Sequence, residues 1–214
     1  MKSFFRQLFD GFWANLGSIL APRRWIWFAL AIVLTYVFVI GGLDWWWYVH
    51  AHVSGLWVWV FPAIVLGTFV PVVVPVWLLF RRRAALGYAL GQAAFMGWAL
   101  SSVLKVFTGR IPPDMAAALG PDISNGFRFG FLRGGIFWGW PSSHTMIAFS
   151  MAAALVALYP RSRGVRFLAP LYALWIGLSV SISIHWFSEF VAGAILGWLC
   201  GWVVGTAARK RLTA

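Results

Sequence analysis

The sequence predicts an all-α, polytopic membrane protein with six transmembrane helices and an N-terminal amphipathic interfacial helix. Of its 214 residues, 62% are hydrophobic and only 10% are charged, a composition outside the range of soluble globular proteins. Six apolar runs approach the roughly 20 residues that a helix needs to cross a bilayer. The basic residues fall almost entirely between these runs. Lipid is therefore expected to be the main solvent of this chain.

The first predicted element is an amphipathic helix over 1–22. It places Lys2, Arg6 and Asp10 among aromatic and aliphatic side chains, with no long apolar stretch before a small-residue cleavage site. This pattern argues against a signal peptide and favours a helix that lies in the membrane interface. The rest of the chain, 23–214, is predicted to form one six-span membrane domain.

The six predicted spans are joined by short polar connections, apart from one longer loop. They cover 25–43, 56–80, 84–104, 142–159, 167–184 and 187–207. Pro71 and Pro75 lie one turn apart and should bend the second span, which neighbouring helices can accommodate. A glycine at every fourth position from 193 to 205 forms a stripe of small residues, which lets another helix approach closely.

The basic residues also predict the orientation of the bundle. With six spans both termini lie on one side, together with 13 of the 17 Lys and Arg residues. The positive-inside rule makes that side cytoplasmic. We therefore expect a multi-pass protein of a bacterial cytoplasmic (inner) membrane with a periplasmic active site, and no nucleic-acid partner despite the net charge of +12. The sequence leaves the oligomeric state open.

The candidate site lies on the outer side, around a loop at about 106–140. This loop holds most of the Pro, Asp and Gly outside the spans, as is typical of a site-bearing loop. Polar residues that are unfavourable near lipid gather at the three helix ends beside it. Lys105 ends the third span, 141–144 opens the fourth, and His185 ends the fifth.

These residue types fit phosphoryl transfer. If the chain is helical from His185 onward, Glu189 lies on the same face and can fix the imidazole tautomer. Ser142 and Ser143 precede His144 and can cap the fourth helix, whose N–H groups and dipole favour an anion. One imidazole can then attack phosphorus while the other protonates the leaving oxygen, and nearby cations offset the charge.

A zinc site is the competing interpretation, with His144, His185 and Glu189 as ligands. It lacks an HExxH-type pair and leaves the nearby cations unexplained. The single cysteine, Cys200, lies in an apolar run and excludes both an internal disulfide and a cysteine-based metal cage. We therefore expect a metal-independent site without a cofactor.

At these residues the chain resembles the type 2 phosphatidic acid phosphatase superfamily of integral-membrane enzymes, which carries three short signatures. The second signature, P-S-G-H, appears at 141–144 as Pro-Ser-Ser-His. The third, S-R-x5-H-x3-D, is matched at His185 and conservatively at Glu189. Leu178 and Ser179 stand where the family has its Ser-Arg pair, so that arginine is absent.

The first signature, K-x6-R-P, is matched at Lys105 and Pro113, while Pro112 stands at its arginine position. The three matches occur in the family's order across about 84–207. The resemblance therefore covers the second half of the chain and departs from the pattern mainly by the loss of two arginines.

The resemblance implies a role for each matched residue. His185 would be the nucleophile, Glu189 its orienting partner and His144 the general acid. Ser143 would contact phosphate and Lys105 would clamp it. Each role is carried over from the position that the residue holds in the family's signatures.

The missing arginines leave phosphate with fewer bidentate partners than the family normally supplies. Arg110, Arg128 and Arg133 are the other outer cations, and we expect one or more of them to replace the missing arginines. Together with Ser142, they complete the predicted substrate-binding set. The prediction for these three arginines rests on their location alone.

The predicted function is that of a membrane lipid phosphatase acting on a lipid phosphate or diphosphate through a phosphohistidine intermediate. An outer site walled by apolar helices favours a phosphate whose tails stay in the bilayer. The resembled family acts on phosphatidate, phosphatidylglycerol phosphate, undecaprenyl diphosphate or lipid A phosphates. A lipid phosphotransferase and a non-catalytic lipid-binding relative remain alternatives, whereas a transporter is not favoured because the six spans show no paired broken helices.

Overall fold

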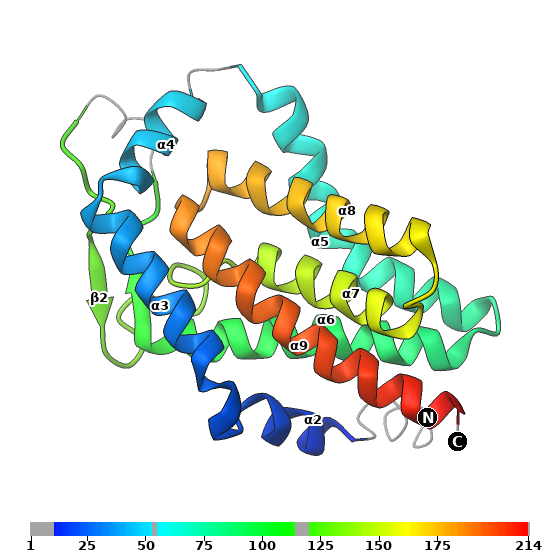
Figure 1. Ribbon diagram of the computed structural model, residues 1–214. Helices are drawn as coiled ribbons and strands as arrows, with labels where there is room; N and C mark the ends of the chain where they lie inside the picture. The colour runs from blue at the N-terminus through cyan, green and yellow to red at the C-terminus, as the bar shows by residue number, and fades with distance from the viewer. Residues whose placement is uncertain (1–10, 53–54, 114–119, 214) are drawn as a thin grey trace.

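The computed structural model describes residues 11–52, 55–113 and 120–213, which form a bundle of helices with a small hairpin at one end (Figure 1). The helices are α2 (Phe12–Ile19), α3 (Trp25–Ile40), α4 (Leu43–His52), α5 (Trp57–Phe80), α6 (Ala84–Phe107), α7 (Ser143–Leu158), α8 (Arg163–Ser183) and α9 (Phe187–Thr213). The long helices α5 to α9 run alternately up and down the bundle, as short connections between sequential helices require (Figure 1).

Helix α7 lies at the centre, packed against α6, α8 and most extensively α9. The predicted glycine stripe makes this contact possible, because a Cβ at Gly197 or Gly201 would clash with the backbone carbonyls of Met146 and Ser150. Small residues at a helix interface let two backbones approach closely. The stripe is therefore a packing feature, as its spacing predicts.

Five of the six predicted spans are long and apolar enough to cross a membrane. They are Pro22–Ile40, Val58–Phe80, Ala84–Phe107, Arg163–Ser183 and Phe187–Thr213. The fourth predicted span, 142–159, is the shorter 16-residue helix α7. The exact count of six is therefore not confirmed.

Two elements of the outer end differ from the prediction. After α3 the chain turns at Gly41 and Gly42 into a separate helix, α4, which the sequence analysis did not predict. The predicted loop at 106–140 contains two antiparallel strands, β1 (Thr108–Arg110) and β2 (Phe127–Phe129). The all-α prediction is wrong in this detail, because backbone groups that leave a buried helix end still need hydrogen-bond partners.

The predicted N-terminal helix over 1–22 lies partly outside the described residues. Its described part is α2, which buries Phe12, Asn15 and Ile19 and exposes Trp13. The Asn15 side chain donates a 2.8 Å hydrogen bond to Gln92 of α6. Helix α2 thus lies beside the C-terminal part of α9 and against α6 (Figure 1).

Candidate active site

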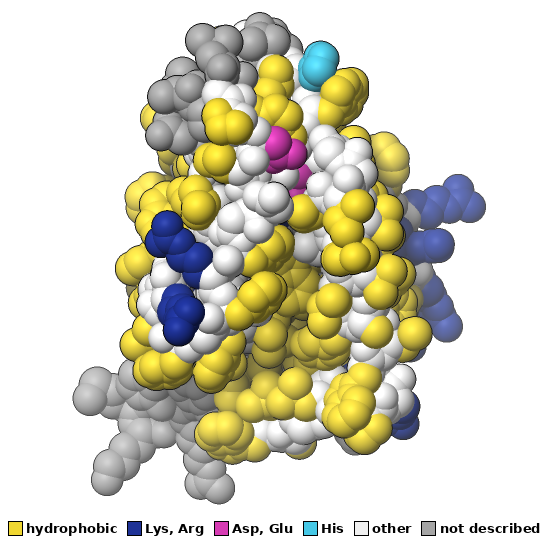
Figure 2. Space-filling model, turned by 90° about the vertical axis from the view of Figure 1, so that its left-hand side faces the viewer, with side chains coloured by type: hydrophobic (Ala, Val, Ile, Leu, Met, Phe, Trp, Pro, Cys, Tyr) yellow, Lys and Arg dark blue, Asp and Glu magenta, His cyan; other side chains and the backbone are white. Residues whose placement is uncertain are grey.

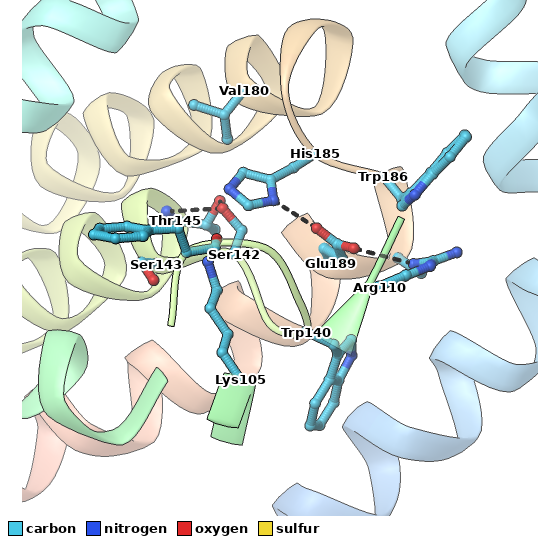
Figure 3. Close-up of polar contacts among 12 residues, drawn as sticks. Lys105, Arg110, Trp140, Ser142, Ser143, Thr145, Val180, His185, Trp186 and Glu189 are labelled. Atoms are coloured by element: carbon cyan, nitrogen blue, oxygen red, sulfur yellow. Dashed lines mark hydrogen bonds and ion pairs between the residues drawn. The ribbon is translucent and has the colours of Figure 1, made fainter. Parts of the chain in front are cut away.

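Most of the predicted site residues meet at the end of the bundle that carries the hairpin (Figure 3). Lys105 comes from the last turn of α6 and His144 from the first turn of α7. His185 lies between α8 and α9, and Glu189 lies in the first turn of α9. Three segments that are far apart in the sequence, around positions 105, 144 and 185–189, therefore contribute to one cluster.

His185 and Glu189 form a buried pair. The imidazole Nδ1 lies 2.5 Å from the Glu189 Oε2, and the two residues are only 4% and 2% exposed. The expectation of a continuous helix from His185 is wrong, because this residue lies in the turn before α9. The contact forms nonetheless, and a proton on Nδ1 leaves Nε2 as the electron-pair donor of the ring.

Burial lowers the pKa of His185 below its ordinary value, because the interior disfavours the charged imidazolium. The hydrogen bond and charge of Glu189 oppose this shift, whereas Lys105 and Arg110 add to it. The lowered pKa favours the neutral form of the His185 ring. A neutral imidazole has the lone pair that a nucleophile needs.

His144 faces His185 with a separation of 6.3 Å between ring centroids. Its Nε2 lies 3.4 Å from the Thr68 hydroxyl, which itself donates to the carbonyl of Ile64 at 2.9 Å. Because the Thr68 hydroxyl proton is already donated to Ile64, the Thr68 oxygen accepts a hydrogen bond from the Nε2–H of His144. Nδ1 of His144 is buried and has no hydrogen-bond partner within the described residues, which leaves this atom for a ligand.

The serines before His144 hold the start of α7. The Ser142 hydroxyl accepts from the backbone N–H of Thr145 at 3.5 Å, so it caps the helix as predicted. The Ser143 hydroxyl lies 3.0 Å from that of Ser101, which itself hydrogen-bonds to the carbonyl of Trp98 at 2.9 Å. The N-terminal N–H groups and dipole of α7 favour negative charge at this point.

Lys105 is 2% exposed, and its ammonium donates to the carbonyl of Phe137 at 2.9 Å. That carbonyl belongs to the loop between the hairpin and α7. An ammonium has three N–H donors, so this contact leaves capacity for further acceptors. Lys105 thus lies beside the two histidines with donors that a phosphate could accept.

Arg110 is placed differently from the prediction. Its guanidinium donates two hydrogen bonds to the carbonyl of Ser124, one from Nε at 2.8 Å and one from Nη2. Nη2 also donates to Asp44 at 2.6 Å. Nη1 donates to Ser188 at 2.9 Å and to Glu189 at 3.4 Å. All five N–H donors thus have protein acceptors. The side chain lies behind Glu189 (Figure 3), so a direct phosphate contact does not fit this arrangement.

The sequence analysis missed Asp44, which anchors this arrangement. Its carboxylate is fully buried and accepts from the Ser188 backbone at 2.7 Å, the Ser188 hydroxyl at 2.6 Å and Arg110. One signal was present in the sequence. Asp44 is one of only five acidic residues, and it stands at the end of an apolar run. A carboxylate placed there needs a cation, and Arg110 is on the same side.

Arg128 and Arg133 are not brought to the histidines. Both are exposed, the first on β2 and the second in the turn that follows, and neither side chain forms a hydrogen bond or ion pair with another described residue. Large apolar side chains around them are exposed as well, including Phe131 and Phe137. Figure 2 shows this face of the molecule, with a hydrophobic hollow along its middle and basic side chains at its margins.

The zinc alternative is not supported by the geometry. Over the described residues, no group of three or more His, Cys, Asp or Glu side chains could hold a metal ion. Because His185 and Glu189 are bonded to each other, their lone pairs do not converge with those of His144 on a common point.

Comparison with known proteins gives one match. A family model described as the PAP2 superfamily matches residues 84–212, more than half of the chain and every residue of the cluster except Asp44 and Thr68. The searches of curated proteins and of solved structures found no match.

Proposed function

The chain belongs to the PAP2 superfamily, the type 2 phosphatidic acid phosphatases, and from that premise we propose that it is a membrane lipid phosphatase with a phosphohistidine intermediate. Members of the superfamily are phosphoesterases, so membership indicates phosphatase or phosphotransferase chemistry on lipid-like substrates. The more specific proposal depends on one observation, which is that His144 and His185 face each other with 6.3 Å between their ring centroids.

The substrate phosphate would lie between the two rings. A reacting atom must come within about 3–3.5 Å of its nucleophile, and an acid within about 2.6–3.2 Å of the leaving oxygen. The 6.3 Å between the ring centroids would therefore let one phosphoryl group reach both rings. Lys105, the Ser143 hydroxyl and the N-terminus of α7 would offset the charge of the phosphate.

In the first step the Nε2 lone pair of His185 attacks phosphorus. The bond from phosphorus to the lipid oxygen breaks, and that oxygen takes a proton from Nδ1 of His144 to leave as an alcohol or a lipid phosphate. The phosphoryl group is then carried on His185. Glu189 stabilises the positive charge that the His185 ring acquires during this step.

In the second step the roles of His144 reverse. Now neutral at Nδ1, it accepts a proton from water while the water oxygen attacks phosphorus. The bond from phosphorus to Nε2 of His185 breaks, which releases inorganic phosphate and restores the nucleophile. His144 thereby regains on Nδ1 the proton that it donated in the first step.

Arg110 and Asp44 would act as positioning residues. Arg110 holds the Oε1 of Glu189, so that Oε2 is directed to His185, and Asp44 neutralises and fixes Arg110. The sequence hypothesis that Arg110 binds phosphate is therefore replaced by this indirect role. Arg128 and Arg133 would serve at the membrane surface, where exposed cations attract anionic lipid headgroups.

The substrate is proposed to be a lipid phosphate or diphosphate that enters from the outer, periplasmic leaflet. The exposed aromatic side chains between β2 and α7 suit insertion at the headgroup level. The contact between Lys105 and the carbonyl of Phe137 links this loop to the site. The orientation itself rests on the excess of basic residues at the opposite end.

Phosphate release from a panel of lipid phosphates and diphosphates in detergent tests this function. We expect release with at least one substrate and its loss in His185→Ala, together with an acid-labile phosphoprotein trapped in the wild-type chain. Product analysis with added lipid alcohols separates hydrolysis from phosphotransfer. An absence of release and of phosphoprotein with every substrate would leave a lipid-binding relative and reject the enzyme.

A further inference from the structure

Away from the histidine cluster, Arg24 in the turn before α3, α3 itself and α9 line an open cavity of about 370 Å³ that the proposed reaction does not use. It is lined by Arg24, Trp27, Trp198, Leu199 and Trp202. A single guanidinium thus shares the cavity with three indole rings. This combination is typical of the headgroup level of a membrane, where indoles and arginines contact lipid.

The cavity contains hydrogen-bond donors without acceptors. Nη1 of Arg24 is buried and has no partner within the described part of the chain. The three lining indoles likewise donate to none of the residues that the structure describes. Because a buried cationic donor without an acceptor is unfavourable, an acceptor from outside the chain is expected at this point.

The position of the cavity indicates a lipid surface. Trp202 lies about 22 Å along α9 from Phe187, given a rise of 1.5 Å per residue. Since the histidine cluster lies at the start of α9 and a bilayer core is about 30 Å thick, the cavity is near the opposite headgroup region. The exposed Arg23 and the basic end of α9 add positive charge there.

We propose that this cavity binds the headgroup of an anionic phospholipid from the leaflet opposite the catalytic face. Arg24 donates to the phosphate oxygens, and the indoles pack against the glycerol and the upper acyl chain. The exposed apolar side of α3, which includes Ile26 and Leu30, continues from the cavity as a surface for that chain. The apolar walls favour a lipid over a free anion.

The test uses the full-length protein in detergent after removal of bound lipid, with phosphatidylglycerol as the probe. This lipid is a phosphodiester without a terminal phosphate, so it is not the proposed substrate. We expect it to raise the Tm in a saturable manner, as a ligand of the folded state does. Arg24→Gln should weaken the apparent affinity about tenfold or more, because a charge-assisted hydrogen bond is lost.

Arg23→Gln is the matched control, since its side chain is exposed and does not line the cavity; it should retain the affinity. Lys105→Ala should retain it too, which separates this cavity from the catalytic site. Trp202→Leu keeps the charge and should weaken binding, and it serves if Arg24→Gln does not fold.

Three results would overturn the proposal. If Arg23→Gln lowers the affinity for phosphatidylglycerol as much as Arg24→Gln does, the lipid is attracted by general surface charge. An equal rise in Tm with phosphatidylcholine would remove selectivity for an anionic headgroup. A rise with inorganic phosphate that Arg24→Gln weakens as strongly as the rise with phosphatidylglycerol would indicate an anion site rather than a lipid site. None of these outcomes depends on phosphatase activity, so the two proposals can fail separately.

Discussion

At the scale of single residues, the two histidines are distinguished by their partners. His185 is tied through Nδ1 to a carboxylate, whereas His144 is held through Nε2 by a hydroxyl. A carboxylate supports the positive charge that a nucleophilic imidazole acquires, and a hydroxyl does not. This difference assigns the nucleophile to His185 and the proton donor to His144 within the proposed reaction.

The assignment predicts that His144→Ala depends on the leaving group. With a lipid monophosphate, whose alkoxide needs a proton to leave, kcat/KM should fall on the order of 10²- to 10⁴-fold. With 4-nitrophenyl phosphate, whose phenolate leaves unprotonated, the fall should be much smaller. His185→Ala is the control and should abolish both reactions. Equal losses for the two substrates in His144→Ala would contradict the assignment.

The buried pair of Asp44 and Arg110 leads to a second prediction. In Asp44→Asn the guanidinium loses its neutralising partner and should draw Glu189 away from His185. We expect the protein to lose about 3–5 kcal/mol of stability, as for other broken buried pairs. We also expect kcat to fall at least tenfold while KM changes little, because substrate contacts are intact.

Arg128→Gln provides the comparison for Asp44→Asn, because Arg128 is exposed and lies outside this network. Its kcat and thermal stability should match those of the wild type. An Asp44→Asn protein with an unchanged kcat would show that Asp44 and Arg110 do not position Glu189.

At the scale of elements, the contact between α7 and α9 positions the residues of the site. It places the first turn of α7 beside the first turn of α9, where the Ser142 backbone N–H donates to the Glu189 carbonyl at 3.1 Å. The glycines of α9 set the distance between the two helices. The separation of the two histidines therefore depends on residues that lie well away from them.

Gly201→Ala should destabilise this contact, because the added Cβ would overlap the backbone of Ser150. Overpacking of this kind typically lowers stability by about 1–3 kcal/mol. Thermal unfolding in detergent provides the measurement. Gly164→Ala in α8 is the matched control, since a Cβ there meets nothing within 4 Å. Similar Tm values for the two variants would refute a close approach of α7 and α9.

At the scale of the whole molecule, charge is divided between two ends. The histidine cluster and the hairpin occupy one end, and the basic turns before α6 and α8 and the basic end of α9 occupy the other. If the basic end faces the cytoplasm, the proposed substrate must come from the outer leaflet. The exposed aromatic loop beside Lys105 would then lie at the outer surface.

Cysteine labelling can measure this orientation. In a Cys200→Ser background, Phe131→Cys should react with a membrane-impermeant maleimide in intact spheroplasts, and Arg82→Cys should react only after permeabilisation. Both side chains are exposed in the structure, so their access depends on the membrane alone. The reverse pattern would place the site in the cytoplasm.

The sequence by itself determined the parts that depend on local pattern. Lipid as solvent requires long apolar helices, so composition and run length located α3, α5, α6, α8 and α9. Short motifs at helix ends located the residues that meet at the cluster, namely Lys105, His144, His185 and Glu189. The four-residue spacing of the glycines also predicted which face of α9 packs against another helix, because residues four apart lie on the same face of a helix.

Only the tertiary structure decided which charges pair. From the sequence, Arg110 was one of several outer cations that could bind phosphate. The sequence did not indicate which residue would pair with Asp44. The fold brings these two together across 66 positions in the chain, beside Glu189. A long guanidinium side chain can reach several acceptors, and its choice depends on how distant elements pack. Helix periodicity carries no information about that choice, so the role of Arg110 follows from the folded arrangement alone.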